Sequence, residues 1–128
     1  MGGGYKPEGY ASISVYVKAD GAQGMIDFLK QTFDAVEMHR YDNADGTIIY
    51  VEVLIDGSVL MIADGQGEFP AFPVWLHVYV PDVDETYRRA LAAGGVPVYE
   101  PEQNGELDRS GCVQDPAGNT WWIATQIG

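Results

Sequence analysis

The sequence contains few basic residues. Seven lysines and arginines stand against nineteen acidic residues among 128, which gives a net charge of −12 at pH 7. Proteins that bind nucleic acid use clustered Lys and Arg to neutralise phosphates, and anionic membrane surfaces attract basic segments. The composition therefore argues against nucleic-acid and membrane partners. It favours solubility, and it would also raise the local concentration of a cationic ligand.

Cysteine and long apolar runs are scarce as well. Cys112 is the only cysteine, which excludes an internal disulfide and fits a reducing compartment. No apolar run approaches the roughly 20 residues of a membrane span, and the first residues lack the pattern of a secretory signal. We therefore expect a cytoplasmic protein. The length suits one domain with a hydrophobic core.

A duplicated pattern is the clearest feature that the sequence does contain. Val15-Tyr16-Val17 returns as Val78-Tyr79-Val80, and the segment 57–63 returns as 118–124. Two landmarks in the same order at nearly the same offset indicate two copies of one supersecondary unit. We predict a single domain over residues 1–128, with units at 10–64 and 74–126 and a linker at 65–73.

Hydrophobic periodicity and turn residues predict the elements of both units. Alternating apolar residues are typical of half-buried strands, and apolar residues spaced as Met25, Ile26 and Leu29 are typical of an amphipathic helix. In the first unit we predict a strand at 11–19, a helix at 22–33, and strands at 36–41, 47–55 and 58–63. In the second we predict a strand at 74–80, a helix at 83–94, a short strand at 96–99, a polar loop at 100–109, and strands at 111–114 and 120–125. The order β-α-β-β-β thus occurs twice.

Several short motifs accompany this doubled unit. They are Asp115–Asn119 before the last strand, Val80–Asp84 before the second helix, Tyr5–Tyr10 near the start, Ile26–Phe28 in the first helix, Asp108–Gly111, and Trp122–Thr125 near the end. Together they cover nearly the whole chain. In this combination the chain resembles the vicinal oxygen chelate superfamily, which includes glyoxalase I, extradiol dioxygenases and bleomycin-resistance proteins. Its PhnB-like branch is the most similar.

The resemblance implies a fold and a place for a metal. The fold is an α+β domain in which two tandem βαβββ units form a cup-shaped mixed sheet with helices on the outer face. In metal-dependent members, His and Glu side chains from the first and fourth strands of each unit hold a divalent ion. The matching positions here are Ser12 or Ser14, Met61, Trp75 and Trp122. Indole cannot ligate such an ion, and a lone thioether or hydroxyl binds one weakly, so we expect no metal and no cofactor.

Other polar side chains remain candidates for the site. His77 and Glu52 could form a two-ligand site or an acid–base pair, although we favour simple hydrogen bonding in the wall of a pocket. Cys112 lacks a base and an orienting group, so we expect an inert thiol, and we assign no catalytic residue. Arg109 could bind an anionic group at the rim, but an ion pair with Asp108 or Glu106 is favoured.

The predicted lining of the cup is rich in aromatic side chains. It consists of Tyr16, Tyr50, Glu52, Met61, Trp75, His77, Tyr79 and Trp122, with Arg109 at the rim. Such a surface suits a flat or cationic organic molecule. The leading hypothesis is a metal-independent protein that sequesters a small cationic or aromatic compound. One alternative is an enzyme of the lyase, isomerase or dioxygenase kind that uses His77 and Glu52. The other is a filled cup that acts in protein association. The resemblance also implies a homodimer.

Overall fold

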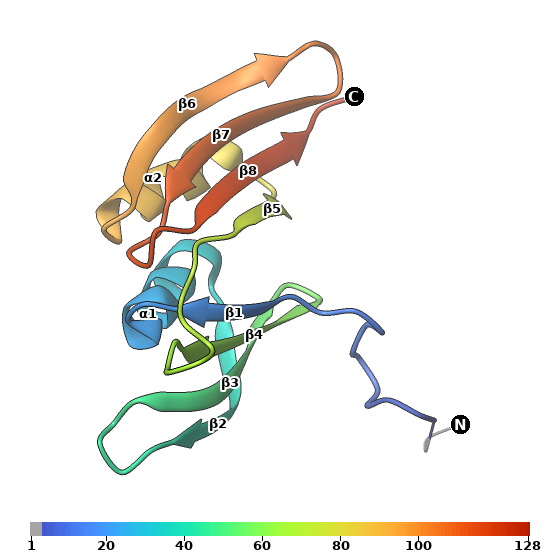
Figure 1. The fold of residues 1–128 in the computed structure, drawn as a ribbon. Helices are drawn as coiled ribbons and strands as arrows, with labels where there is room; N and C mark the ends of the chain where they lie inside the picture. The colour runs from blue at the N-terminus through green and yellow to red at the C-terminus, as the bar shows by residue number, and fades with distance from the viewer. Residues whose placement is uncertain (1–3) are drawn as a thin grey trace.

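Each half of the chain folds into one helix and four strands. The computed structural model describes residues 4–128 (Figure 1). The first unit contains β1 (Tyr16–Ala19), α1 (Ala22–Phe33), β2 (Val36–Asp42), β3 (Ile48–Ile55) and β4 (Ser58–Asp64). The second contains β5 (Trp75–Tyr79), α2 (Val83–Ala92), β6 (Val96–Asn104), β7 (Asp108–Gln114) and β8 (Thr120–Gln126). The predicted order β-α-β-β-β, written twice, is confirmed. Within residues 4–128, neither helix is long and apolar enough to cross a membrane.

The two units form separate mixed sheets with the same topology. The strand orders are β1-β4-β3-β2 and β5-β8-β7-β6. In each sheet the first strand runs parallel to the fourth, and the other neighbours are antiparallel. Tyr16 pairs with Met61 in the first sheet, and His77 pairs with Trp122 in the second. Both pairs lie 61 residues apart between units, which confirms the repeat at the level of strand register.

Each sheet carries its helix on one face only. On α1 the side chains of Met25, Ile26, Phe28 and Leu29 are buried against the first sheet, as their helical spacing predicts. Removing a side chain of this size from water stabilises a fold by about 1.5–3 kcal/mol. The strand residues on this face belong to one core that runs through both units. The opposite face of each sheet has no helix, and we call these two surfaces the inner faces.

The units are joined on the helix side. The ring of Phe33, at the end of α1, lies 5.0 Å from the ring of Trp121 on β8. At the same end of α1, Arg89 on α2 donates two hydrogen bonds to Asp34. Gly95 comes so close to the Phe28 ring that an added Cβ would lie 3.0 Å from it. Figure 1 shows the two helices side by side, while the strands diverge from them. In the part of the chain that the structure describes, no strand of one sheet pairs with a strand of the other.

A buried aspartate fixes the turn between β7 and β8. Asp115 is only 3% exposed. Its carboxylate accepts hydrogen bonds from the backbone N–H groups of Ala117 and Asn119 and from the side chains of Asn119 and Trp121. The Trp121 indole N–H reaches it at 2.9 Å. The turn therefore holds the indole that joins the units.

The first strand is shorter than its alternating pattern predicts. We expected a strand at 11–19, but β1 begins at Tyr16. The backbone of Val15 still accepts a hydrogen bond from Met61, and the residues before it have no partner strand. Ile13 is accordingly 89% exposed. Alternation predicts an extended chain, but only a neighbouring strand makes that chain part of a sheet.

The prediction of a polar loop at 100–109 is also wrong. Here β6 continues to Asn104, turns, and returns as β7 from Asp108. The long hairpin escaped prediction because its residues are mostly charged and exposed, and because Pro101 argues against a strand. Pro101 lies in an irregular stretch of the β6–β7 pairing, where the register shifts between Tyr99 and Glu102. At such an interruption a missing N–H costs little.

We predict that Asp115→Ala lowers the free energy of unfolding by about 3 kcal/mol, because it leaves buried donors without a partner. Asp84→Ala is the matched control. Asp84 lies on the surface and forms an ion pair with Arg109, so its loss should cost less than about 1 kcal/mol. Urea denaturation of both variants measures the difference. Equal losses would contradict the structural role given to Asp115.

Candidate functional site

The inner faces carry two matching rows of side chains. In the first sheet, Tyr16 on β1, Met61 on β4 and Glu52 on β3 are neighbours in register. In the second, the corresponding row is His77 on β5, Trp122 on β8 and Cys112 on β7. Successive side chains of a strand point to opposite faces, so the residues between these positions enter the core. The alternation in sequence thus separates the core from the candidate site.

Glu52 is a buried acidic residue on the first inner face. It is 9% exposed, and its two carboxylate oxygens accept hydrogen bonds from the hydroxyl groups of Tyr10, at 2.5 Å, and Tyr50, at 2.6 Å. The Tyr10 hydrogen bond, followed by that of Tyr50, holds the pKa of Glu52 below its usual range. The nearby His39 acts in the same direction through its electrostatic attraction for the carboxylate. The site therefore presents a fixed, ionised carboxylate at neutral pH.

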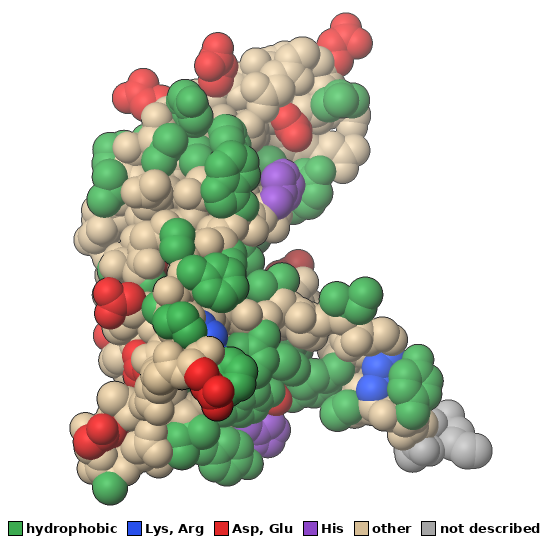
Figure 2. All heavy atoms as spheres, viewed as in Figure 1, with side chains coloured by type: hydrophobic (Ala, Val, Ile, Leu, Met, Phe, Trp, Pro, Cys, Tyr) green, Lys and Arg blue, Asp and Glu red, His purple; other side chains and the backbone are tan. Residues whose placement is uncertain are grey.

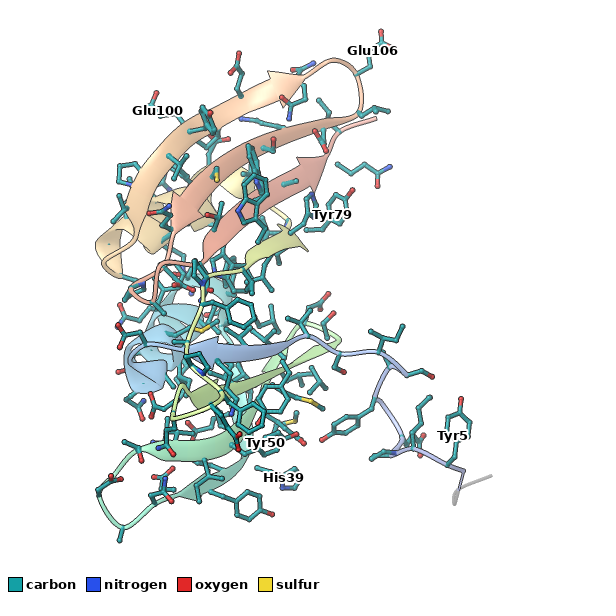
Figure 3. The ribbon with its side chains drawn as sticks, in the orientation of Figure 1. Tyr5, His39, Tyr50, Tyr79, Glu100 and Glu106 are labelled. Atoms are coloured by element: carbon teal, nitrogen blue, oxygen red, sulfur yellow. The ribbon has the colours of Figure 1, made fainter. Side chains whose placement is uncertain are left out.

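The phenols around Glu52 stay neutral. Burial, and then the neighbouring Glu52, raises the pKa of Tyr50, and the hydrogen bond to Glu52 raises that of Tyr10. The Tyr50 ring also meets the Tyr16 ring edge to face, with centroids 5.9 Å apart. The ammonium nitrogen of Lys18 lies 5.2 Å from the Tyr16 ring centroid. One aromatic ring of this face therefore already has a cation next to it. Figure 3 shows Tyr50 and His39 close together beside the first sheet.

The second inner face is built from larger rings. Tyr99 on β6 stacks on Trp122, with centroids 5.7 Å apart. The His77 and Tyr79 rings meet edge to face at 4.7 Å. Trp75 and Tyr79 are 77% and 65% exposed, which is unusual for such large side chains. Cys112 is fully buried, and burial raises the pKa of its thiol, so it is not positioned as a nucleophile.

The positions at which metal-dependent relatives hold their ligands do not fit a metal here. Matching positions of the two units lie 61 residues apart in the strand register. Trp75 therefore corresponds to Ser14 and not to Ser12. The four side chains are then Ser14, Met61, Trp75 and Trp122. Two of them are indoles, which offer a divalent ion no lone pair, and the other two are weak neutral ligands. Elsewhere in residues 4–128, no three His, Cys, Asp or Glu side chains gather in a metal-binding arrangement.

Two predicted partnerships are not formed. Among residues 4–128 no hydrogen bond joins His77 to Glu52, and the two belong to different sheets. Arg109 forms a two-point ion pair with Asp84 on α2, at 2.8 and 2.9 Å, rather than with Asp108 or Glu106. On β7, Arg109 lies three residues from Cys112, which is on the inner face. Because neighbouring side chains of a strand point to opposite faces, Arg109 lies on the helix side of the sheet. The structure therefore removes Arg109 from the rim of the inner faces.

A cavity of about 540 Å³ lies where the two units diverge. Figure 2 shows the molecule deeply hollowed between them. Residues 55–60, around the β3–β4 turn, form one wall, and residues 76–79 of β5 form another. Residues 11 and 13–15, which precede β1, form a third. The lining includes His77 and Tyr79 from the second inner face and Leu76, Val78 and Trp121 from the opposite face, so the cavity lies at the edge of the second sheet. We call it the seam cavity.

A sequence model of the Glyoxalase/Bleomycin resistance protein/Dioxygenase superfamily matches residues 15–123. The chain belongs to this superfamily. An uncharacterized protein of Mycobacterium tuberculosis is 36% identical over 127 aligned residues, which cover 91% of this chain and 75% of that protein. The predicted membership, drawn from the doubled unit and its motifs, is confirmed.

Solved structures of low sequence identity share the fold. TioX from Micromonospora sp. ML1 has a TM-score of 0.73 at 22% identity, covering 90% of this chain and 95% of TioX. A PhnB protein from Bacillus cereus has a TM-score of 0.66 at 15% identity, covering 90% and 99%. TnmS3, an antibiotic binding protein from Streptomyces sp. CB03234, has a TM-score of 0.68 at 19% identity, covering 91% and 99%. The superfamily and its PhnB-like members are therefore the structural relatives of this chain.

The predicted lining leaves out three residues of the inner faces. Tyr10 precedes the first strand and is brought to Glu52 only by the path of the chain. His39 lies on β2, where an irregular pairing between Glu37 and Arg40 obscures which face a residue occupies. Tyr99 lies two residues after Pro97 on the edge strand β6, and nothing in the sequence around it predicts that its ring stacks on Trp122. The Tyr5–Tyr10 motif contributes to the resemblance, but nothing local in it indicates that Tyr10 binds a residue 42 positions away.

The lowered pKa of Glu52 predicts a pH dependence of stability. A carboxyl group whose pKa lies below its ordinary value of 4.5 stabilises the folded state above that pH. This contribution is lost as the pH falls through the lowered pKa. We expect the free energy of unfolding of Glu52→Gln to decrease less steeply than that of the wild type between about pH 5 and pH 3. Urea titrations at several pH values measure both slopes, and parallel curves would contradict the assignment.

Proposed function

We propose that this protein captures a small, planar, preferably cationic organic molecule between its inner faces. The observations that carry the proposal are the ionised, tyrosine-bonded Glu52 on the first inner face and the large aromatic side chains that the fold leaves exposed on the second. A large exposed aromatic surface is costly in water and usually marks a binding site. A buried carboxylate whose two hydrogen-bond partners are neutral phenols keeps its negative charge and adds charge selectivity to that surface.

The electrostatics favour a cation. Aromatic faces attract positive charge, and each such contact contributes about 0.5–2 kcal/mol. Lys18 on the first inner face would oppose a cation, but its ammonium group already lies against the Tyr16 ring. The net charge of −12 favours the approach of cationic ligands over longer distances. Shape and charge together support a flat amine or ring cation.

The structural relatives support the capture of small molecules. TnmS3 is described as an antibiotic binding protein and shares the fold. The mechanism that we propose for this chain is stacking on Trp75 and Trp122, with Glu52 as the counter-ion. His77 offers a polar contact at the seam cavity. Capture of this kind makes and breaks no covalent bond.

We further propose that the protein is a homodimer in which each site is completed by the partner chain. The two inner faces of one chain belong to different sheets and carry different side chains. A second copy related by a twofold axis would bring the first inner face of one chain opposite the second inner face of the other. The exposed Trp75 and Tyr79 would then be covered. The same contact would exclude water from a ligand held between the faces.

Proflavine, a planar tricyclic cation, tests ligand capture, and acridone serves as its neutral counterpart. We expect proflavine to quench tryptophan fluorescence with saturation and to bind more tightly than acridone. Trp75→Ala should weaken proflavine binding roughly tenfold, because stacking and cation–π contacts are lost. Glu52→Gln should weaken proflavine binding and leave acridone binding nearly unchanged.

Glu106→Gln is the matched control for the change in charge. Glu106 is exposed near the turn between β6 and β7, far from Tyr50 in Figure 3. This variant should bind both probes as the wild type does. Equal affinity of the wild type for proflavine and acridone would contradict the charge preference. Absence of saturable binding by either probe would contradict capture.

Light scattering after size exclusion tests the homodimer. We expect twice the mass of one chain for the wild type. Trp75→Glu should reduce the mass to that of one chain, because it places a charge in the contact between inner faces. Leu107→Glu is the control, since Leu107 is 76% exposed in the turn between β6 and β7. A monomeric wild type, or a dimer that Trp75→Glu leaves intact, would contradict the proposed assembly.

A further inference from the structure

The residues before β1 form an arm that extends from the body of the protein. Residues 4–15, which we call the N-terminal arm, contain no helix or strand. Figure 1 shows the arm running away from the first unit, and Figure 3 shows Tyr5 at its far end. Tyr5 and Ile13 are 91% and 89% exposed. The arm therefore contributes little to the hydrophobic core.

One side chain ties this arm to the body. Over the described residues 4–15, the hydrogen bond from Tyr10 to Glu52 is the only side-chain hydrogen bond to the rest of the chain. Where the arm joins β1, the backbone of Val15 also bonds to Met61. Tyr10 itself is held by a turn, in which its N–H donates to the carbonyl of Pro7 and Gly9 adopts a φ of +86°. This turn presents the phenol to the inner face.

The same arm encloses the seam cavity. Its residues Ala11, Ile13, Ser14 and Val15 line that cavity opposite residues 76–79 of β5. The cavity volume of about 540 Å³ is large enough for a drug-sized molecule. The wall made by the arm is tied to the body at two places, by the backbone bond between Val15 and Met61 and by the hydrogen bond from Tyr10 to Glu52. Loss of the Tyr10 hydrogen bond would leave the arm tied only where it joins β1.

We propose that part of the captured planar ligand enters the seam cavity beside His77 and Tyr79, and that the N-terminal arm is the detachable wall of this cavity, latched by Tyr10 on Glu52. The inference rests on the proposed capture function and adds a means of retention to it. With the latch closed, Ile13 and Val15 cover the ligand. With the latch open, the arm moves away and the ligand exchanges with solvent. Tyr10 is thus a positioning residue for the wall.

Cleavage of the ligand-free protein tests the latch on its own. A glutamate-specific protease cuts after Glu8, next to the turn that presents Tyr10, and mass spectrometry follows that product. Tyr10→Phe keeps the ring and loses the hydrogen bond, so cleavage after Glu8 should be roughly tenfold faster. Tyr50→Phe is the matched control, because it removes an equally short bond to the same carboxylate without untying the arm. Wild-type cleavage rates in Tyr10→Phe would overturn the latch.

Stopped-flow dissociation of proflavine tests retention. If the arm holds the ligand, Tyr10→Phe should release proflavine roughly tenfold faster than the wild type, in proportion to its faster cleavage. Faster cleavage with unchanged or slower release would overturn the role of the arm in retention. If proflavine and acridone bind to neither protein, capture itself is contradicted, while the cleavage rates still decide whether the arm is latched. Near-UV circular dichroism confirms that the variants keep the native fold.

Discussion

The contact between Phe33 and Trp121 determines which faces of the two sheets remain uncovered. The two rings join the units through the faces that the helices cover, and Asp115 holds the Trp121 indole in place. Because the joint uses the helix side, the opposite faces of both sheets are left free. Had the units met through those faces instead, the side chains around Glu52 would be ordinary core. The seam cavity, the inner faces and the arm all follow from this choice of joint.

Glu52 lies next to a position that the resemblance to metal-dependent members matches to a metal ligand. In register, Glu52 stands directly beside Met61, which occupies a position where metal-dependent relatives place a ligand. The carboxylate is therefore one strand away from the expected place, and it is satisfied by two phenols rather than by an ion. An apolar side chain at this position would cost less to bury. A buried anion kept ionised by neighbouring hydroxyl groups is typical of a site that recognises charge.

The sequence predicted those parts of the fold that depend on local pattern. The helix at 22–33, the Asp56-Gly57 hairpin and the doubled order of elements are specified by periodicity and turn chemistry close to each residue. Contacts between distant segments were out of reach. Arg109 has acidic neighbours in sequence, yet it binds Asp84 because α2 passes over β7. Tyr10 meets Glu52 for a similar reason, so the inner faces were predicted as a surface but not as a set of bonds.

The same distinction explains the two errors in the strands. An extended segment becomes a strand only when a neighbour pairs with it, and among the described residues 4–128 no strand pairs with residues 11–14. The long β6–β7 hairpin does have a partner, but its charged residues resemble a loop when they are read alone. Strand pairing depends on contacts between distant segments. A sequence pattern predicts it only when one face of the strand is buried and its residues alternate between apolar and polar.

The proline-broken β6 has a consequence for how copies of this chain meet. Outermost strands expose unpaired N–H and C=O groups and invite another molecule to extend the sheet. Here β6 carries Pro97 and Pro101 and an irregular register, β2 is irregular as well, and β1 and β5 are only four and five residues long. Sheet extension is thus discouraged at every border. The borders of the two sheets therefore protect a molecule with much exposed aromatic surface from growth into open-ended fibres.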